Sequence, residues 1–392
     1  MFKLFGSLLA ILISCAVVAF LAMFTLEAVF KIDTPLSPDG FIGRLADALN
    51  IEQPLIVTPT PYVSPEPTPT PHAMDLFTGE TEEKEMVFPV DMSYNWLGDP
   101  YCHNGKIICS AGELVDGKAI MTTLVEYDIA SGSVRKLSIE AQNDHLIFPV
   151  FNDKWLVYFD ANAEFGGGSI CMLDLTRSGS APTIVKTVYA GQPEIKLDGD
   201  YIAWMERTGS DRDKVFVCDL NTLETTVVQY FSRSGYGTSM PYLHDGILIW
   251  AAEDGTYYED GRTTSSIKYI DLQESSINEY LPGTYVHDPE FNGTYYAWLD
   301  AHHSESTDLY YSGGTQAILI DTGVVEFGIS DNYIAYSKGE AVWIFVFENQ
   351  KTYRLTPERE SAQFLGVSGG YVMWMDVTSR ERDIIRYVRL PI

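Results

Sequence analysis

The chain has 392 residues, enough for two or three domains, and its 54 acidic and 26 basic side chains give a formal net charge of −28. A nucleic-acid-binding protein shows the opposite charge or a basic stripe, and the sequence has neither, so we expect no nucleic-acid partner. An acidic chain stays soluble and repels anionic polymers, whereas cationic partners or divalent ions fit its charge.

The first predicted element is a membrane span. Residues 4–26 contain no charged side chain, and a helix of that length rises about 35 Å, enough to cross a bilayer. No convincing cleavage site precedes Glu27, so we expect residues 1–30 to be a cytoplasmic tip and a retained anchor. Lys3 precedes the span and a net negative segment follows it. The positive-inside rule then predicts a single-pass protein of the cell membrane, with a cytoplasmic N-terminus and the remainder outside.

An alternative interpretation of the same segment is a lipid anchor. LISC at residues 12–15 resembles a bacterial lipobox, with Cys15 as the residue to be lipidated. Cleavage there would leave the strongly apolar AVVAFLAMF at the start of the mature protein. Both interpretations place the soluble part outside the cell, on a membrane.

Two connecting segments follow the anchor. Residues 31–57 form a juxtamembrane segment, either a poorly ordered spacer or a short helix with one apolar face. Residues 58–85 are predicted to be a linker, first rich in proline and threonine and then acidic. Proline at nearly every second position of TPTPYVSPEPTPTP removes amide donors and fixes φ. At about 3.1 Å per residue, residues 58–71 would span roughly 40–45 Å and hold the next domain clear of the lipid.

Residues 86–392 contain a repeated phrase of aliphatic and aromatic residues, as in YIAWME and YVMWMD. Its aligned positions are spaced by 38 to 48 residues: Ser110, Tyr158, Trp204, Trp250, Trp298, Tyr336 and Trp374. A period near 45 residues fits four short strands with their turns, which is the size of a propeller blade. The sequence therefore predicts an all-β fold, a seven-bladed β-propeller of four-stranded antiparallel blades.

Each unit supplies candidates for its strands. A stretch with a proline, such as QPEIKLDG, ends in a tight turn and is predicted to be the innermost strand. The phrase is the second strand, and runs such as KVFVCDL, or QAILIDT in the fifth unit, are predicted to be third strands. The seventh unit ends before a fourth strand, and EMVFPVDM at residues 85–92 is predicted to supply it and close the ring.

The interior of the propeller is predicted from the same alignment. The tryptophans of the phrase fit the widening gap between neighbouring blades. Three cysteines lie in strand-like runs and are predicted to be small core residues: Cys109, Cys171 and Cys218.

The order of proline, short strand, Asp-Gly turn, Tyr-Ile-Ala-Trp and a strand ending in Asp-Leu resembles the TolB-like group of bacterial propellers. In this chain the pattern is carried by Pro193, the turn at 198–199, the phrase at 201–204 and the pair at 219–220. The resemblance covers about residues 84–392 and implies the propeller architecture. TolB-like repeats carry a Ser-Pro-Asp-Gly turn, of which this chain keeps only the Asp-Gly part.

Candidate binding residues follow the second strand of each unit. Long segments there are predicted to be loops on the face where the inner strands begin. A carboxylate stands two or three residues after the phrase aromatic in five units: Asp160, Glu206, Glu253, Asp300 and Asp376. Such a ring fits a divalent cation or a basic partner, and solvated loops with local turn bonds are the alternative.

Two further groups complete the candidate binding site. Tyr257, Tyr258, Tyr310 and Tyr311 have glycine-rich neighbours and fit an aromatic contact patch for a protein or a glycan. His302 and His303 stand close to several acids, but their spacing matches no metal-binding pattern. We therefore predict no cofactor and no metal site, except for a divalent cation at the acidic rim.

No catalytic motif occurs in the sequence: a GxSxG elbow, a P-loop and a dinucleotide fingerprint are all missing, and no catalytic residue is assigned. Glu194 and Glu290, at equivalent inner-strand positions, fit the carboxylate pair that a propeller glycosidase needs. We expect a non-enzymatic, membrane-anchored, extracytoplasmic propeller that binds or scaffolds an envelope protein or glycan. The alternative is a polysaccharide-active hydrolase or lyase that uses carboxylates of the channel or the rim.

Overall fold

A computed structural model describes residues 56–57 and 83–390, apart from 89–91, 93, 95, 116–117, 144, 163–165, 207–212, 232–238, 259–262, 275, 283–284, 304–305, 315, 358–359 and 379–382. The chain divides into two compact units. The first consists of Met1–Thr58 and Gly255–Gly261, and the second of Pro59–Asp254 and Arg262–Ile392. In the first unit, β1 (Ile56–Val57) pairs in parallel with residues 257–258.

The N-terminal elements predicted from the sequence lie largely outside the described residues. These are the apolar span at residues 4–26, most of the juxtamembrane segment and nearly all of the linker. Within the part of the chain that is described, no helix is long and apolar enough to cross a membrane.

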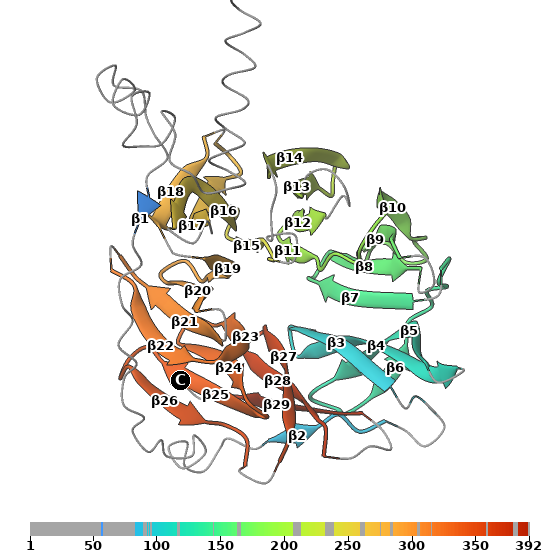
Figure 1. Ribbon diagram of the computed structural model, residues 1–392. Coiled ribbons are helices and arrows are strands. Elements are labelled where there is room, and N and C mark those ends of the chain that lie inside the picture. The colour runs from blue at the N-terminus through green and yellow to red at the C-terminus, as the bar shows by residue number, and fades with distance from the viewer. Residues whose placement is uncertain are drawn as a thin grey trace, which may run out of the picture. The chain divides into compact units, whose positions relative to one another are not determined.

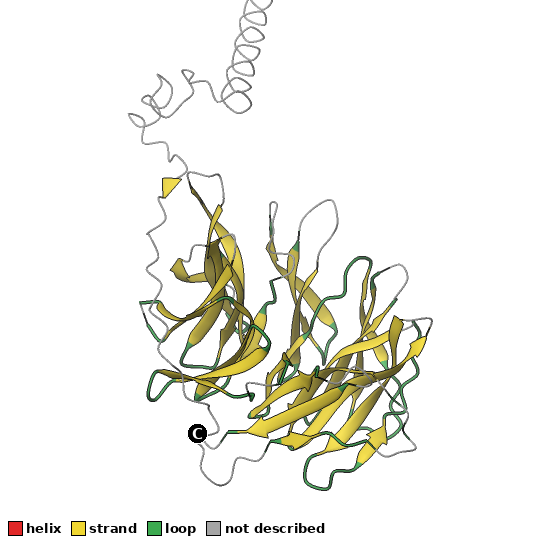
Figure 2. Cartoon of the chain, turned by 60° about the horizontal axis from the view of Figure 1, so that its bottom comes forward, coloured by secondary structure: helices red, strands yellow, loops and turns green. Residues whose placement is uncertain are grey.

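The second unit is all-β, and its described part shows strands and loops without a helix (Figure 2). Seven antiparallel sheets form the blades of a propeller and follow one another in chain order around a ring (Figure 1). Blade 1 is β3 (Trp96–His103), β4 (Lys106–Val115), β5 (Lys118–Asp128) and β6 (Val134–Lys136). Blade 2 is β7 (His145–Phe151), β8 (Trp155–Ala161), β9 (Gly168–Asp174) and β10 (Thr183–Val188). Blade 3 is β11 (Lys196–Asp198), β12 (Tyr201–Glu206), β13 (Lys214–Asp219) and β14 (Glu224–Tyr230).

The remaining four blades repeat this order from the inside outward. Blade 4 is β15 (Tyr242–His244), β16 (Ile247–Tyr258), β17 (Thr263–Asp271) and β18 (Asn278–Pro282). Blade 5 is β19 (Val286–Phe291), β20 (Tyr296–His303), β21 (Ser306–Ser312) and β22 (Ile318–Thr322). Blade 6 is β23 (Val324–Ile329), β24 (Tyr333–Lys338), β25 (Ala341–Val346) and β26 (Lys351–Arg354). Blade 7 is β27 (Ala362–Ser368), β28 (Tyr371–Asp376), β29 (Ile384–Arg389) and β2 (Lys84–Glu85).

The ring is closed by the N-terminal strand, as the sequence predicts. β2 pairs antiparallel with β29, and the N–H of Met86 continues the pairing to the Ile385 carbonyl at 2.9 Å. The paired segment is shorter than the predicted strand at 85–92 and begins one residue earlier. Arg386 reinforces the closure because its guanidinium contacts Glu83 at 2.7 Å and Asp376 at 2.9 Å. Blade 7 is therefore built from both ends of the propeller sequence.

The repeated phrase forms the second strand of each blade and fills the core. Trp204, Trp250 and Trp374 are at most 1% exposed, and the indole of Trp204 stacks on the Phe216 ring at 5.0 Å. A buried aromatic side chain removes about 150–250 Å² from water, so these rings contribute a large part of the packing energy. The predicted core role of the cysteines is also confirmed, since Cys109, Cys171 and Cys218 are free thiols in the interior.

Neighbouring blades are joined where the first and second strands turn, at what we call the turn face. The Asn152 side chain donates to the Gly199 carbonyl at 2.7 Å, and the Asn292 side chain donates to the Ser330 carbonyl at 2.7 Å. Other turns make equivalent bonds: Asn104 to Asp153 at 2.6 Å, Gly246 to Asp198 at 2.8 Å and Cys102 to Ser368 at 2.8 Å. The Asn-Gly and Asp-Gly pairs of the sequence thus connect blades as well as turning the chain.

The strand assignment of the fifth unit was wrong by one strand. The run QAILIDT, predicted to be the third strand, contains β22, which is the outermost strand of blade 5. The third strand is β21, within a segment predicted to be a loop. Its alternate residues Leu309 and Tyr311 are 0% and 3% exposed, so it is a core strand. Its polar flanks concealed this short alternation in the sequence.

The predicted long loops of units one, four and five are largely extended hairpins. β4 continues to Val115 and β5 begins at Lys118, while β20 ends at His303 and β21 begins at Ser306. We call the face on which the inner strands begin the entry face. In blade 1 the inner strand begins at Trp96, opposite Gly112, so residues 113–115 extend past it. In blade 6 the hairpin ends level with the inner strand, because Val324 pairs with Lys338.

Candidate functional site at the propeller axis and the entry face

Two inner strands carry an aspartate at a bulge. Asp99 and Asp288 each precede a proline and have left-handed φ values of 49° and 46°, a conformation that aspartate tolerates. The ladder register shifts at both places, as expected for a β-bulge that turns a side chain out of the regular alternation. The Asp99 carboxylate accepts the Phe148 N–H at 3.2 Å, and that of Asp288 accepts the Met240 N–H at 2.6 Å. Each carboxylate therefore bonds to a neighbouring blade near the axis.

Further charged side chains stand on or beside the inner strands of other blades. We call the following set the axial cluster: Asp99, Glu194, Lys196, Asp288, Glu290 and Glu326. Glu194 influences the pKa of carboxyl groups in blades 1, 5 and 6. Successive inner strands contact one another around the ring, and β27 contacts β3. Side chains from these blades come within electrostatic reach only at the axis, so the cluster lies there.

Four carboxyl groups of the axial cluster resist ionisation, namely those of Asp99, Asp288, Glu290 and Glu326. Burial raises the pKa of Asp99 and of Asp288 to about 6 and that of Glu290 to about 7. The negative charge of Glu194 adds to the increase for all three groups. The pKa of Glu326, which is more exposed to solvent, is raised by the same two causes. The cluster thus combines partial removal from water with mutual repulsion of like charges.

One ammonium group faces these carboxylates within the cluster. Lys196 Nζ lies 3.9 Å from Glu194 Oε2 and 5.8 Å from the centre of the Tyr242 ring. Its charge partly offsets the raised pKa of Asp288 and Glu290. The cluster has five carboxylates and a single lysine, so its electrostatic balance favours a cationic ligand or a proton.

Glu194 and Glu290 were predicted to occupy equivalent positions, and both belong to the axial cluster. The strand register differs from that prediction, because Glu290 pairs with Ala297 whereas Lys196, not Glu194, pairs with the corresponding Ala203. Asp99 and Asp288 were missed, although the Asp-Pro pairs of DPYCHNG and DPEFNG were visible in the sequence. A bulge depends on the pairing of two strands, so the sequence alone did not show that these aspartates turn towards the axis.

Two of the predicted rim acids, Asp160 and Asp300, accept backbone N–H groups of their own blade. Asp160 is 2% exposed and accepts the N–H groups of Gln142 and Asn143 at 2.8 and 3.0 Å. Asp300 accepts the Tyr285 N–H at 3.1 Å, on the approach to β19. These bonds satisfy backbone donors at the start of an inner strand.

The rim acid of blade 7 has a different partner. Asp376 accepts the Thr378 N–H at 3.0 Å and two guanidinium bonds from Arg386. Because of these hydrogen bonds and the Arg386 charge, which outweigh its burial, the pKa of Asp376 is lowered. It takes part in the closure of the ring.

Glu206 occupies the same position in blade 3 but differs in its contacts. It is 8% exposed, and its Oε2 atom is buried without a hydrogen-bond partner. Burial raises the pKa of this carboxyl group, against the opposing charges of Lys186 and Lys214.

The other predicted site residues lie on strands. Glu253, Tyr257 and Tyr258 belong to β16, and His302 and His303 end β20, but their side chains lie outside the described part. Tyr310 lies on β21 and is half-buried, with its ring stacked on Trp298 at 5.9 Å and an interplanar angle of 14°. Tyr311 lies on the same strand and is buried, so the structure brings neither Tyr310 nor Tyr311 into an open loop patch.

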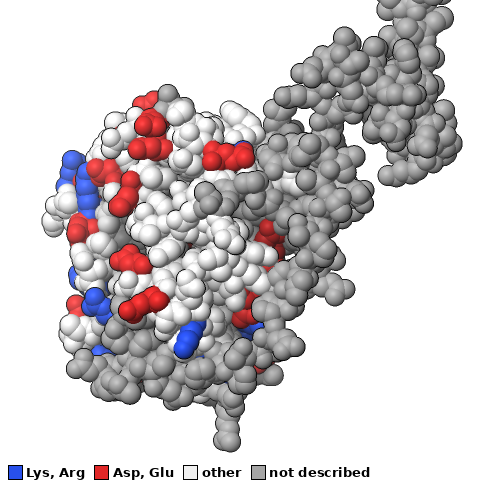
Figure 3. All heavy atoms as spheres, turned by 90° about the vertical axis from the view of Figure 1, so that its left-hand side faces the viewer, with Lys and Arg blue, Asp and Glu red and all other residues white. Residues whose placement is uncertain are grey.

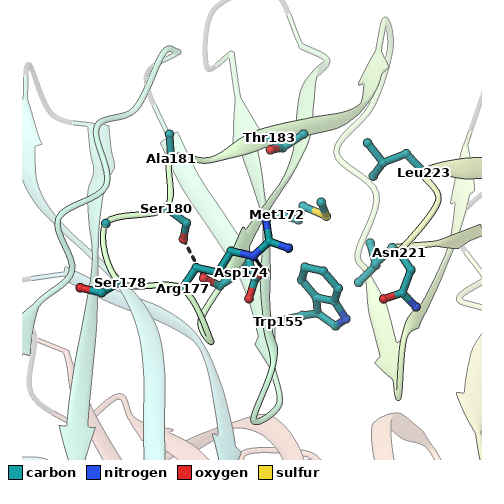
Figure 4. A pocket seen from close by; sticks show the side chains of 12 residues that line it. Trp155, Met172, Asp174, Arg177, Ser178, Ser180, Ala181, Thr183, Asn221 and Leu223 are labelled. Carbon is teal, nitrogen blue, oxygen red and sulfur yellow. Dashed lines mark hydrogen bonds and ion pairs between the residues drawn. The ribbon is translucent and has the colours of Figure 1, made fainter.

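A groove of about 550 Å³ lies on the turn face between blades 2 and 3 (Figure 4). Trp155 and Met172 form part of its wall, and Arg177 reaches over it from the loop before β10. Its polar groups are largely engaged with one another. The Arg177 guanidinium contacts the Asp174 carboxylate at 3.0 Å, and the Ser180 hydroxyl donates to the Asp174 carbonyl at 2.6 Å.

Surface charge is dispersed elsewhere. On the side of the molecule shown in Figure 3, Asp and Glu side chains are spread among uncharged ones, with Lys and Arg mainly towards its edges. Among the described side chains, no group of three His, Cys, Asp or Glu residues is arranged to hold a metal ion. The axial cluster and the buried Glu206 Oε2 atom, which has no hydrogen bond of normal geometry, are the two features that stand out.

No family model and no curated protein matches the sequence, whereas many solved structures share the fold. The propeller domain of the Trilobed protease from Pyrococcus furiosus matches with a TM-score of 0.58 at 15% identity, over 75% of this chain and 93% of that one. That domain has an open velcro topology, whereas here β2 pairs with β29. The Vibrio parahaemolyticus oligogalacturonate lyase matches with a TM-score of 0.51 at 10% identity, over 79% of this chain and 97% of that one.

Other similar structures extend well beyond a propeller. This chain spans about half the length of the Pyrococcus horikoshii acylaminoacyl peptidase that it resembles, namely 53%, at 12% identity and a TM-score of 0.56. A protein described as TolB from Agrobacterium tumefaciens is also similar, at 12% identity over 58% of this chain and 80% of that one, with a TM-score of 0.40. The propeller architecture that the predicted resemblance implies is confirmed by the seven sheets and by the similarity to the Trilobed protease domain. At these identities the likeness shows the fold alone.

Proposed function

We propose that the chain is a membrane-anchored, extracytoplasmic β-propeller that binds or scaffolds an envelope protein or glycan at its entry face. The observation that carries this proposal is the axial cluster, which contains five carboxylates and one lysine. Its charge suits a partner that brings a cationic group to the axis, such as a basic side chain or an amino sugar. The apolar segment at residues 4–26 and the proline-rich linker support a position outside the cell, on a membrane.

The uneven outline of the entry face supports a binding role. The hairpin of blade 1 extends past its inner strand, and β20 of blade 5 continues to His303, three residues beyond the pair of Val286 with Asp300. Blade 6 has no such extension. Hairpins project from the entry face on some blades and not on others, so one part of this face differs in shape from the rest. Such a difference suits recognition of one partner.

A binding assay with charge variants tests this proposal. The purified full chain would be immobilised and exposed to solubilised envelope fractions, with the retained protein and glycan quantified. The double variant Glu194→Gln with Glu326→Gln removes two negative charges from the axial cluster. Neither carboxylate makes a hydrogen bond within 3.5 Å to another described residue. We expect retention to fall several-fold, and to fall likewise in the unmodified chain at high salt.

The control is the double variant Glu224→Gln with Glu140→Gln, which removes two exposed charges outside the axial cluster. Equal retention by both pairs of variants would contradict the proposal.

A second candidate function is glycan cleavage, favoured by one observation. The Glu290 carboxyl has its pKa raised to about 7, mainly by burial, which is the range of a general acid at neutral pH. A polyanionic substrate such as a polyuronate would be repelled by the other axial carboxylates, so a neutral or amino-sugar polymer suits this alternative better. Release of reducing ends or unsaturated products from envelope polysaccharides, lost in Glu290→Gln, is the expected result. No release from any polysaccharide tested would contradict it.

A further inference from the structure

Glu206 is the rim acid whose carboxylate is left without a full set of partners. Its buried Oε2 atom and the nearby Trp204 indole N–H both lack a hydrogen bond of normal geometry, whereas the equivalent Asp160 accepts two backbone N–H groups. A buried acceptor without a donor costs about 1–3 kcal/mol. A ligand that brings a donor to this atom would recover that cost on binding.

The strands beside Glu206 place a cation and an aromatic ring in a row with it. Lys214 on β13 is the cross-strand partner of Glu206, and Tyr230 on β14 is the partner of Lys214. Directly opposed residues have Cβ atoms about 4.5–5.5 Å apart, so the three side chains share one surface. Lys214 Nζ lies 5.7 Å from the centre of the Tyr230 ring, and Tyr230 is 54% exposed.

Blade 2 contributes the opposite border of this surface. Lys186 on β10 reaches across to blade 3, where its Nζ lies 5.2 Å from the centre of the Phe216 ring. Its charge acts on the Glu206 carboxylate together with that of Lys214. Tyr189 directly follows β10 and is 86% exposed. Neither lysine lies within ion-pair distance of Glu206, so both ammonium groups can donate to a ligand.

We infer that Glu206, Lys186, Lys214 and Tyr230 form a binding site for one sugar ring of a neutral glycan. The two lysines repel a cationic ligand, and the Glu206 carboxylate disfavours an anionic group placed against its buried oxygen. Sugar hydroxyl groups can donate to Glu206 and accept from the lysines at the same time. Exposed tyrosine rings cover the apolar face of a sugar at a small cost in side-chain entropy. The inference rests on the proposed binding role and names the glycan class at a site separate from the axial cluster.

Calorimetric titration of the full chain tests this site. The probes are tetrasaccharides of glucose, mannose, galactose and N-acetylglucosamine. We expect at least one to bind. Glu206→Gln should weaken binding by about 10-fold or more, as the loss of one charged hydrogen bond predicts, and Tyr230→Ala should weaken it by about the same factor because the ring against the sugar is lost. Glu224→Gln and Tyr201→Ala change the same residue types at the opposite end of blade 3 and should leave the affinity unchanged.

The controls separate this site from the axial cluster. Thermal unfolding of each variant shows whether the fold is kept, and removal of the buried charge in Glu206→Gln is not expected to lower stability. Failure of all four tetrasaccharides to bind overturns the inference, and so does binding that survives both Glu206→Gln and Tyr230→Ala. One outcome would contradict this site and still support the proposed function: no tetrasaccharide binds, but Glu194→Gln with Glu326→Gln abolishes envelope retention.

Discussion

The Glu290 carboxylate accepts a hydrogen bond from the Ile329 N–H at 2.7 Å, which joins the inner strand of blade 5 to that of blade 6. The same carboxyl group faces the charges of Asp288 and Glu194. One side chain therefore stabilises a blade interface through its acceptor oxygen while its negative charge is disfavoured. This conflict makes the stability of the propeller depend on pH.

We predict that Glu290→Gln stabilises the protein at neutral and alkaline pH. The pKa is raised from an ordinary value of 4.5 to about 7, so the folded state prefers the protonated group. The stabilisation from that proton is complete below about pH 4.5 and is lost as the pH rises through 7. Glutamine keeps an acceptor for Ile329 without the charge, and because water reaches this half-buried side chain we expect a gain of about 1–2 kcal/mol at pH 8.

Urea denaturation at pH 4.5, 6 and 8 measures this effect. The difference between Glu290→Gln and the original protein should grow with pH, while Glu224→Gln, which changes an exposed carboxylate, should show no such trend. A variant that is less stable than the original protein at every pH would mean that the Ile329 bond needs the charged acceptor.

The second prediction concerns the acceptor that holds two blades together at the turn face. Asp200 accepts bonds from the Lys154 ammonium at 2.9 Å and from the Trp155 indole N–H at 2.7 Å. The Lys154 bond is the largest cause that lowers the pKa of Asp200 to about 2. Stabilisation is therefore present above about pH 4 and is lost as the pH falls towards 2. The side chain is 40% exposed, and after allowance for solvent screening we expect Asp200→Asn to cost about 1 kcal/mol at pH 7.

The pH dependence distinguishes this ion pair from a packing effect. The difference in unfolding free energy between Asp200→Asn and the original protein should shrink at pH 3. Asp245→Asn, an exposed carboxylate in the corresponding turn of blade 4, should cost less at pH 7. A cost that is the same at pH 7 and pH 3 would assign the effect to packing.

The sequence predicted the architecture because propeller repeats are local. The second strand of each blade carries its own alternation and its buried aromatic, as in the strand around Trp204, so the period and the number of blades follow from the alignment. The closure by the N-terminal strand also followed, because the seventh unit lacked one strand. Blade 5 was misassigned because STDLYYS hides two core positions, Leu309 and Tyr311, among polar residues.

The site was less predictable because it depends on contacts between blades. Glu194 and Glu290 could be selected because each follows the proline of its unit, but Asp99 joins them only through a bulge and the ring closure. The bonds of Asp160 to the backbone before β7 could not be read from its place after the phrase. Equal positions in the repeat, such as Asp160 and Glu206, therefore have unequal surroundings.

A third prediction concerns the closure of the ring. Arg386 contacts Glu83 and Asp376, and the side chain of Asp376 is 9% exposed. Arg386→Met would leave these carboxylates without the guanidinium, and we expect a loss of about 2–4 kcal/mol because a buried charge remains unpaired. Arg389→Met on the same strand removes an exposed guanidinium that lies over the Tyr371 ring at 5.9 Å and should cost less than 1 kcal/mol.

Hydrogen exchange localises the effect of Arg386→Met. The Met86 amide, bonded to the Ile385 carbonyl at 2.9 Å, should exchange faster in this variant than in Arg389→Met. Unchanged protection of Met86 together with a lower global stability would show that Arg386 supports blade 7 without holding β2 in place.

The last prediction tests how tightly blades 7 and 1 approach each other. Gly369 and Gly199 both lie in inner hairpin turns with φ near +56° and +55°. A Cβ on Gly369 would lie 2.8 Å from the Cys102 carbonyl oxygen of blade 1, whereas one on Gly199 would meet no atom within 4 Å. An alanine in the left-handed backbone conformation costs about 1–2 kcal/mol of stability at either position. The clash with the Cys102 backbone adds to this cost only at Gly369. We expect Gly369→Ala to lose about 2 kcal/mol more than Gly199→Ala in urea denaturation, because the Ser368 hydroxyl also holds the Cys102 N–H at 2.8 Å and leaves little room to shift. Equal losses of stability in the two variants would show that the interface between blades 7 and 1 shifts to accommodate a methyl group.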